Sequence, residues 1–238
     1  MHFSFSVSAP SGKHFCMGFD RLSGDLDTFA NDFTNNMIPL DITSKITFDI
    51  LNGISFVHKN GFLHSDIKPE NILIQKYEGK MTCKISDLGT ACVIDDREFP
   101  YLQTSHYRSP DIIMGYRKWN EKIDIWSIGC VVFECITGSY LFRGENETDY
   151  ITSFIETLGI PSITFMDQCR HKREFFNRDD KFIYSSELEP LSIDRILQEK
   201  YRFDMKTANS IYAIVQPMLI WDPEKRWSAS DLLSLYTS

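Results

Sequence analysis

The stretch HSDIKPENIL, residues 64–73, brings an acid, a lysine and an amide within six positions. Pro69 favours an extended backbone at Lys68, so Asp66, Lys68 and Asn71 are expected to lie in a loop rather than in a helix. Phosphoryl transfer from ATP needs a base for the attacking hydroxyl, a cation near the transferring group and magnesium on the phosphates. Asp66 could accept the proton, Lys68 could supply the positive charge, and Asn71 could ligate the metal.

The loop runs directly into an apolar strand that turns back at residues 77–79 and ends at Asp87. The return strand is expected to bring Asp87 beside Asn71, and Gly89 allows a sharp turn just beyond it. Asn71 and Asp87 would then offer the hard oxygen ligands that Mg²⁺ prefers. The alternative is a hairpin that happens to begin with polar residues. That alternative does not explain the full order of H-x-D-x-K-P-x-N, strand, return strand and D-L-G.

Helical periodicity dominates the rest of the chain. From Asp41 to Gly61, apolar residues recur at the spacing of one helical face, with Asp41 as the expected N-cap and Gly61 just past the end. Residues 122–138 are apolar nearly all round, which is typical of a helix in the middle of a domain. Further helices are expected at 25–32, 149–159, 208–220 and 228–236.

Strands are expected in small pairs at one end of this helical body. Residues 13–19 are expected to form a strand after a turn at 9–12, and residues 71–74 should pair with 82–86. The strand at 13–19 would have an unpaired edge and would expose apolar surface. The charged stretch 168–190 is most simply a solvated loop. The predicted fold class is therefore α+β, mostly helical with small β-hairpins.

Composition limits the classes of function. The chain has 238 residues, 42% hydrophobic residues and a net charge of −8. This charge argues against nucleic acid as the main partner, and it suits either a cationic peptide or solubility alone. The six cysteines form no C-x-x-C pair, which predicts a reducing compartment without a disulfide framework or zinc site. The N-terminus has no signal-peptide pattern, and no stretch is apolar enough to span a bilayer. We expect a soluble, intracellular monomer.

The motifs resemble those of the eukaryotic protein kinases, whose H-R-D-x-x-x-x-N and D-F-G signatures match in order and context. The resemblance runs from about Lys13 to Tyr236 and covers the large lobe of the kinase fold. Lys68 followed by P-E-N is similar to the serine/threonine class. Ser65 in place of arginine and Leu88 in place of phenylalanine are similar to SR-protein kinases, within the CMGC group. Residues 1–24 would be a remnant of the small lobe, and residues 25–238 would form the C-terminal lobe.

The resemblance implies ATP and Mg²⁺ as cofactors and assigns roles by position. The catalytic set would be Asp66, Lys68 and Thr104, with Thr104 holding the other two in register. Asn71 and Asp87 would hold the metal ion and the nucleotide phosphates. Leu73 would lie under the adenine, and the backbone of Asp20 and Leu22 would meet the base edge, although these two could also form an undistinguished turn. Structural roles would fall to Asp124 below the catalytic loop and to a buried pair of Asp111 with Arg226.

The resemblance also implies a substrate class and a way of regulation. SR-protein kinases dock arginine-rich segments in an acidic groove, and Asp149 and Glu156 match acidic positions of that groove on one face of a helix. Ser139 stands where the family commonly has another acid, and acids on a surface helix are often only solvated. Arg/Ser-rich proteins such as splicing factors are the implied partners, in cytoplasm and nucleus. Because Ser65 cannot anchor a phosphate as arginine does, activity is expected without phosphorylation of the activation loop.

The printed chain also lacks features of a complete kinase. No G-x-G-x-x-G motif occurs, and the only lysines before Asp66 are Lys13, Lys45 and Lys59, none of them in a V-A-I-K-like strand. The sequence therefore predicts most of the small lobe to be missing, poor ATP affinity and slow transfer from this chain alone. Two other functions stay open, a non-catalytic binding module and a small-molecule phosphotransferase. The residues KPEN and TSHYRSPD argue against the phosphotransferase, and the intact Asp66, Asn71 and Asp87 favour a kinase.

Overall fold

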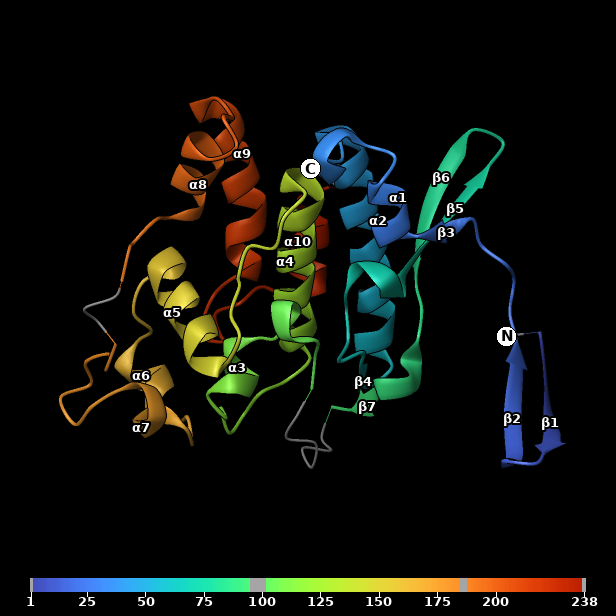
Figure 1. The fold of residues 1–238 in the computed structure, drawn as a ribbon, viewed down its shortest axis with the longest axis horizontal. Helices are drawn as coiled ribbons and strands as arrows, with labels where there is room; N and C mark the ends of the chain where they lie inside the picture. The colour runs from blue at the N-terminus through green and yellow to red at the C-terminus, as the bar shows by residue number, and fades with distance from the viewer. Residues whose placement is uncertain (1, 95–101, 185–187, 237–238) are drawn as a thin grey trace.

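The computed structural model describes residues 2–94, 102–184 and 188–236. Two long helices, α2 (Leu40–Lys59) and α4 (Lys122–Thr137), pack against each other in the middle of the body. Figure 1 shows the later helices on one side of α4 and the β5–β6 and β1–β2 hairpins on the far side of α2. This arrangement agrees with the α+β class predicted from the sequence.

The strands form three small antiparallel sheets. The first pairs β1 (Phe3–Ala9) with β2 (Gly12–Gly18), and another pairs β4 (Phe62–Leu63) with β7 (Cys92–Val93). The third has the strand order β3 (Gly24–Asp25), β5 (Ile72–Tyr77) and β6 (Lys80–Ile85). Glu78 and Gly79 connect β5 to β6, and both have a positive φ, as a tight two-residue hairpin turn requires.

The other α-helices are shorter than α2 and α4. They are α1 (Leu26–Ala30), α3 (Pro110–Ile113), α5 (Glu147–Leu158), α6 (Ile163–Met166), α7 (Lys172–Phe175), α8 (Ile193–Glu199), α9 (Met205–Val215) and α10 (Ala229–Ser234). Short 3₁₀ turns lie at 34–36, 69–71, 88–90, 105–107 and 216–218. Within the described ranges, no helix has both the length and the apolar character needed to cross a membrane.

Helix α4 is the centre of the core, as its apolar sequence predicts. Nearly all of its side chains are buried, from Ile123 to Thr137. The indole of Trp126 stacks on Phe142 with ring centroids 5.4 Å apart and meets the edge of Phe154 at 5.0 Å. Such aromatic pairs add to the burial of their own surface. They join α4 to α5, so the helical body behaves as one packed unit.

Two expectations from the sequence were wrong. Asp41 does not cap α2, because the N-cap is Pro39, two residues earlier, and the helix begins at Leu40. Asp41 lies in the first turn, where an acid interacts favourably with the helix dipole. The stretch 168–190 is not simply a solvated loop. It contains α7, and the rings of Phe175 and Phe176 are buried in the core.

The charges of that stretch pair with one another, which lets it fold against the body. Lys172 is buried, and its Nζ lies 2.6 Å from Asp167 Oδ1 and 2.7 Å from Asp180 Oδ1. Arg173 Nη1 meets the same Asp180 oxygen at 3.0 Å. The hydrogen bonds that the Lys172 ammonium donates to these two carboxylates raise its pKa above the ordinary value. The many charged residues of this stretch therefore belong to an ion-pair network, where the sequence analysis expected a solvated loop.

The sequence analysis missed two elements, strand β1 and helix α8. Strand β1 was not expected, although its sequence FSFSVSA alternates apolar and polar residues with the period of a strand. Helix α8 was also missed, although Ile193 and Leu197 stand four positions apart and are both buried. In both cases the periodic signal was present but short.

The predicted pair of Asp111 and Arg226 forms and is completely buried. Arg226 Nη2 lies 2.7 Å from Asp111 Oδ2, and both side chains have 0% exposure. The guanidinium also donates to the carbonyls of Ile220, Trp221 and Lys122. Asp111 Oδ1 has no hydrogen-bond partner among the described residues, so the buried negative charge of this carboxylate is balanced by Arg226.

We predict that Arg226→Met lowers the free energy of unfolding by about 3–5 kcal/mol, because it leaves the Asp111 charge buried and uncompensated. Urea denaturation measures the change. The matched control is Arg195→Met, which breaks the exposed pair of Arg195 with Glu199 at 2.6 Å and should cost less than about 1 kcal/mol. Equal losses in the two variants would contradict the role assigned to the buried pair.

Candidate active site

The catalytic loop is fastened to helix α4 by one carboxylate. Asp124 Oδ2 accepts a hydrogen bond from the backbone N–H of His64 at 2.8 Å, and Oδ1 accepts one from Ser65 at 2.9 Å. The ring nitrogen Nε2 of His58 lies 2.9 Å from Oδ2. Asp124 has 0% exposure and sits in the first turn of α4. The loop backbone therefore has a fixed position relative to the most buried helix of the core.

Asp66, Lys68 and Thr104 meet, as the family resemblance implied for their positions. Lys68 Nζ lies 2.7 Å from Asp66 Oδ2 and donates to Thr104 Oγ1 at 3.2 Å. The Thr104 hydroxyl donates to Asp66 Oδ1 at 2.7 Å. The three side chains thus form a closed triangle between the catalytic loop and the segment before α3. Each carboxylate oxygen of Asp66 has a defined partner, which fixes the direction in which it can accept a proton.

The charge state of Asp66 follows from these contacts. Burial alone would raise the pKa of the carboxyl, but the hydrogen bonds from Lys68 and Thr104 and the positive charge of Lys68 outweigh it. The pKa of Asp66 therefore lies below its ordinary value. At neutral pH the group is an anion, as a proton acceptor must be.

The amide of Asn71 is oriented by Asp66. Asn71 Nδ2 donates to the backbone carbonyl of Asp66 at 2.8 Å and to Asp66 Oδ2 at 3.2 Å. The oxygen Oδ1 is then left as the ligand atom of this side chain. Strand β6 returns beside it, because Ser86 N and Oγ both donate to the Asn71 carbonyl, at 2.8 and 3.0 Å. Asp87, the next residue, is brought to the same end of the hairpin.

Asp87 has the properties of an available metal ligand. Its side chain is exposed, and its backbone has the left-handed φ of 60°. One oxygen, Oδ1, accepts from the N–H of Gly89 at 3.2 Å. Together Asn71 and Asp87 present an amide oxygen and a carboxylate, a donor set that suits Mg²⁺. Among the described residues no group of three or more His, Cys, Asp or Glu side chains forms a metal cluster.

Ser65 joins the catalytic loop to the segment after Asp87. Its Oγ donates to the carbonyl of Thr90 at 2.5 Å, and its own carbonyl accepts from the N–H of Gln103 at 2.9 Å. The Thr90 hydroxyl donates back to the His64 carbonyl at 3.3 Å. Ser65 holds a left-handed φ of 65° to make these bonds. Ser65, which replaces arginine, therefore contacts Thr90 and Gln103, toward the two ends of the activation segment, the loop from Asp87 to Asp111.

Gln103 is a positioning residue that the sequence reading missed. Its side chain is buried, and Nε2 donates to the Ile123 carbonyl at 2.9 Å and to Ser127 Oγ at 2.8 Å. Oε1 accepts from the N–H of Ser109 at 3.0 Å. Gln103 thus connects the residues around Thr104 to α4. In the sequence alone, a glutamine immediately before the threonine could not be distinguished from an ordinary surface residue.

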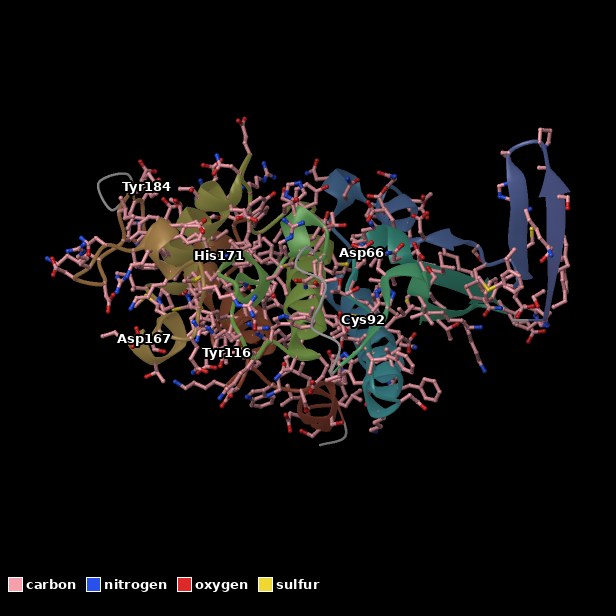
Figure 2. The ribbon with its side chains drawn as sticks, turned by 90° about the horizontal axis from the view of Figure 1, so that it is seen from below. Asp66, Cys92, Tyr116, Asp167, His171 and Tyr184 are labelled. Atoms are coloured by element: carbon pink, nitrogen blue, oxygen red, sulfur yellow. The ribbon has the colours of Figure 1, made fainter. Side chains whose placement is uncertain are left out.

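The expected nucleotide residues lie on the hairpin side of the triad. Leu73 is half-buried in β5, opposite Asp25 of β3 and Lys84 of β6. Asp20 and Leu22 lie between β2 and β3; Asp20 is exposed, with Oδ1 2.9 Å from His2 Nε2, and Leu22 is half-buried. Figure 2 shows Asp66 in the half of the molecule nearer the β1–β2 hairpin, with Asp167, His171 and Tyr184 toward the opposite end.

A second acidic group near the catalytic loop was also missed. Glu134 of α4 is half-buried, and its Oε2 accepts from the hydroxyl of Tyr107 at 2.7 Å. Burial, opposed by the Tyr107 hydrogen bond and reinforced by the charges of Glu70 and Asp27, raises its pKa from 4.5 to about 7. We call Asp27, Glu70 and Glu134 the acidic cluster. The three acids come from separate elements, so their spacing in the sequence could not have revealed the cluster.

The acidic cluster borders a small cavity of about 40 Å³ that Asp27 and Glu134 line together with Pro69 and Gly138. Gly138 ends α4 with a φ of 65°, and a Cβ built on it would lie 1.9 Å from the carbonyl oxygen of Asn35. No side chain fits there. The end of α4 and the turn at 34–36 therefore touch through their backbones.

Asp149 and Glu156, the expected docking residues, are both on α5 and line one open hollow of about 440 Å³. Each also has a partner within the protein. Asp149 Oδ2 accepts from the N–H groups of Glu145 and Asn146 in a capping box, and Glu156 Oε1 accepts from Glu189 N at 2.9 Å. Arg143 and Lys200 line the same hollow. The hollow therefore carries both signs of charge, and Ser139 does not line it.

Comparison with known proteins identifies the family. The sequence pattern of the protein kinase domain matches residues 5–236, which is nearly the whole chain. The chain therefore belongs to the protein kinase family. Its relatives place it with the serine/threonine kinases of the CMGC type. Protein kinases as a class use ATP and Mg²⁺, which agrees with the ligand set of Asn71 and Asp87.

Two kinds of relative stand out. The serine/threonine-protein kinase SRPK of Physarum polycephalum is 30% identical over 97% of this chain and 68% of its own length. The dual specificity tyrosine-phosphorylation-regulated kinase 3 of mouse is 37% identical over 69% of this chain. The DYRK-family kinase pom1 of Schizosaccharomyces pombe is 30% identical over 90% of this chain. The aligned regions cover only 28% and 19% of the mouse and yeast proteins.

We predict that Thr104→Val lowers the rate of phosphate transfer about 10²-fold, because it removes the hydroxyl that orients Asp66 and Lys68. Thr104→Ser keeps the hydroxyl and should restore most of the rate. Single-turnover transfer of labelled phosphate measures both, and urea denaturation shows that the variants are folded. A serine variant as slow as the valine variant would remove the hydroxyl from the explanation.

The raised pKa of Glu134 predicts a pH-dependent stability. Between pH 4.5 and 7 the folded state keeps a proton that the unfolded state has lost, so the free energy of unfolding falls as pH rises through this window, by about 3 kcal/mol. Glu134→Gln should remove this slope. Urea denaturation from pH 5 to pH 8 measures it, with Glu224→Gln at an exposed position as the control. A slope that persists in Glu134→Gln would contradict the assignment.

Proposed function

We propose that this protein transfers the γ-phosphate of ATP to serine in Arg/Ser-rich protein substrates. The observation that carries the proposal is the closed triangle of Asp66, Lys68 and Thr104. Its carboxylate is held as an anion in a fixed orientation beside an ammonium group. A substrate hydroxyl placed at Asp66 would give up its proton as the phosphoryl group is transferred, and the Lys68 ammonium would stabilise the charge on that group.

Asn71 and Asp87 would hold magnesium at the phosphates. The bond from Asn71 Nδ2 to Asp66 turns the amide oxygen away from the triad, and Asp87 keeps one oxygen that accepts no hydrogen bond from the described residues. Bound Mg²⁺ would neutralise the phosphate charges. Leu73 on β5 would support the adenine ring from below, and the exposed backbone of Asp20 and Leu22 would contact the base edge.

The substrate class rests on the charge around the catalytic loop. The acidic cluster of Asp27, Glu70 and Glu134 lies at α1, at the KPEN turn and on α4; burial raises the pKa of Glu134, and the charges of Glu70 and Asp27 add to that effect. Carboxylates that repel each other are relieved by a cation between them. Arginine from a substrate would supply that cation. The overall charge of −8 favours the same class of basic partner over nucleic acid or a membrane surface.

Docking of a basic segment at Asp149 and Glu156 is part of this proposal. Each carboxylate keeps acceptor capacity beyond the backbone N–H groups it binds, so an arginine could still be bound. Arg143 and Lys200 line the same hollow, so the arginines of a docked peptide would contact Asp149 and Glu156 and lie away from these two residues. Regulation of splicing factors in cytoplasm and nucleus is the role that follows from such substrates.

The activation segment would be ordered without phosphorylation. Ser65 bonds to Thr90, and Gln103 bonds to Ser65 and to α4, so protein groups supply the contacts that a phosphate would otherwise make. These contacts are present in the unmodified chain. We propose that treatment with a phosphatase leaves the rate of transfer unchanged.

The rate of transfer should nevertheless be low. We propose that residues 25–238 act as the C-terminal lobe and residues 1–24 as a remnant of the small lobe. We propose that the lysines before Asp66 do not contact the triphosphate, because Lys45 pairs with Asp49, Lys59 ends α2 and Lys13 lies in the β1–β2 hairpin. This observation also favours a second candidate function, a binding module that keeps the basic-peptide site and transfers little or no phosphate.

The two functions are separated by one experiment. With magnesium-ATP and an Arg-Ser peptide, we predict slow incorporation of phosphate that Asp66→Asn abolishes, because the variant cannot accept the proton. Incorporation should also fall for a peptide in which alanine replaces each arginine. Measured peptide binding with no incorporation by the wild type would favour the binding module. Equal incorporation by wild type and Asp66→Asn would remove Asp66 from the mechanism.

A further inference from the structure

Tyr140 adjoins both groups of acids that the proposed function uses. It comes just after the end of α4 and lines the hollow of Asp149 and Glu156. Tyr107 joins it to the acidic cluster, because the Tyr107 hydroxyl donates to Glu134 at 2.7 Å. The rings of Tyr107 and Tyr140 meet nearly at right angles, with their centroids 6.1 Å apart. The Tyr140 ring therefore connects the surroundings of the acidic cluster to those of α5.

His106 holds the Tyr140 ring in place. The two rings are stacked, with centroids 4.0 Å apart and planes inclined by 12°. Nδ1 of His106 lies 2.9 Å from the hydroxyl of Tyr150 on α5, and the imidazole also makes a hydrogen bond with the backbone of Phe142. Tyr150 and Phe142 are both buried, so they fix the imidazole. Tyr140 is thus supported on one face while 38% of the residue stays exposed.

The charges around this stacked pair favour a cation. Burial and the positive charge of Arg143 lower the pKa of His106, so the supporting imidazole is neutral at pH 7 and does not repel a cation. Burial raises the pKa of the Tyr140 phenol, and each acid of the acidic cluster raises it further by more than Arg143 lowers it. The net field of the surrounding charges at the Tyr140 ring is therefore negative.

An aromatic face distinguishes between the two basic side chains, which carboxylates alone attract alike. The guanidinium of arginine is planar and stacks on an aromatic ring, whereas the ammonium of lysine is a compact and strongly hydrated point charge. A tyrosine ring that is held flat, partly exposed and surrounded by negative charge therefore favours arginine. The acids supply the attraction for any cation, and the ring supplies the preference.

We propose that Tyr140 is a specificity-determining residue that stacks on a substrate guanidinium and selects arginine over lysine. The inference rests on the proposed function, because it concerns the basic residues of the same substrates. His106 follows Thr104 by two positions, a span of at most roughly 7 Å. Thr104 in turn bonds to Asp66. The arginine on Tyr140 would therefore be one close to the reacting serine, and Asp149 and Glu156 would bind arginines farther along the chain.

Peptide binding tests this selectivity without phosphate transfer. The two probes are a fluorescent Arg-Ser peptide and the same peptide with lysine in place of every arginine, followed by fluorescence anisotropy. The wild type should bind the arginine peptide about 5-fold more tightly than the lysine peptide, as a cation–π contact at a partly exposed ring allows. Tyr140→Leu should lose affinity for the arginine peptide and bind the two peptides equally. Tyr140→Phe keeps the ring and should keep the preference.

Tyr184→Leu is the matched control. Tyr184 has almost the same exposure, 37%, and lies toward the end of the molecule opposite Asp66 (Figure 2), so this variant should retain the preference of the wild type. Far-UV circular dichroism and urea denaturation show that each variant is folded.

Three outcomes would overturn the proposal while leaving the proposed function intact. They are a wild type that binds both peptides equally, a Tyr140→Leu variant that still prefers arginine, and a Tyr140→Phe variant that does not. Binding of neither peptide by the wild type would contradict the substrate class itself, and the role of Tyr140 with it. A kinase that bound arginine selectively and transferred no phosphate would instead support Tyr140 and contradict the proposed transfer.

Discussion

The site depends on the attachment of the catalytic loop to α4 through Asp124. A buried carboxylate is tolerated only when its charge is compensated, and here the backbone N–H groups of His64 and Ser65 and the ring of His58 provide the hydrogen bonds. The same hydrogen bonds fix the position of the first residues of the catalytic loop. From that point Asp66 and its neighbours follow with little freedom, because the backbone before them is held by the most buried helix of the protein. The catalytic side chains are therefore held in place by the rigid core that carries their loop.

Strained backbone occurs at residues that connect the catalytic loop to the rest of the site. Ser65, Asp87 and Gln103 all hold a left-handed φ, of 65°, 60° and 68°, which costs free energy for residues with a side chain. Each of them makes hydrogen bonds that an ordinary conformation would break: Ser65 with Thr90 and Gln103, Asp87 with Gly89, and Gln103 with α4. The hydrogen bonds offset the strain and hold the metal side and the substrate side of the site in one arrangement.

The sequence predicted the parts of the site that are local and periodic. The β5–β6 hairpin places Asn71 and Asp87 at one end because a tight turn fixes the register, and the apolar run of α4 predicted its burial. The spacing of Asp66 and Lys68 predicted their loop, but the meeting with Thr104 came only from the family resemblance. The acidic cluster and the role of Gln103 could not be predicted, because they join residues from elements far apart in the chain. Strand β1 was missed because seven alternating residues give a weak signal.

The contact of Gly138 with Asn35 has an implication for how substrate preference could change during evolution. Because two backbones touch there, the spacing between α4 and the α1 region cannot widen or narrow by exchanging one side chain for another. Ile38 adds a second tie, since its N–H donates to the Cys135 carbonyl at 2.7 Å. On the proposed function, new specificity would arise by altering the acids of the acidic cluster while the backbone around them keeps its position. Descendants of this chain could therefore diversify in what they recognise while glycine stays at position 138.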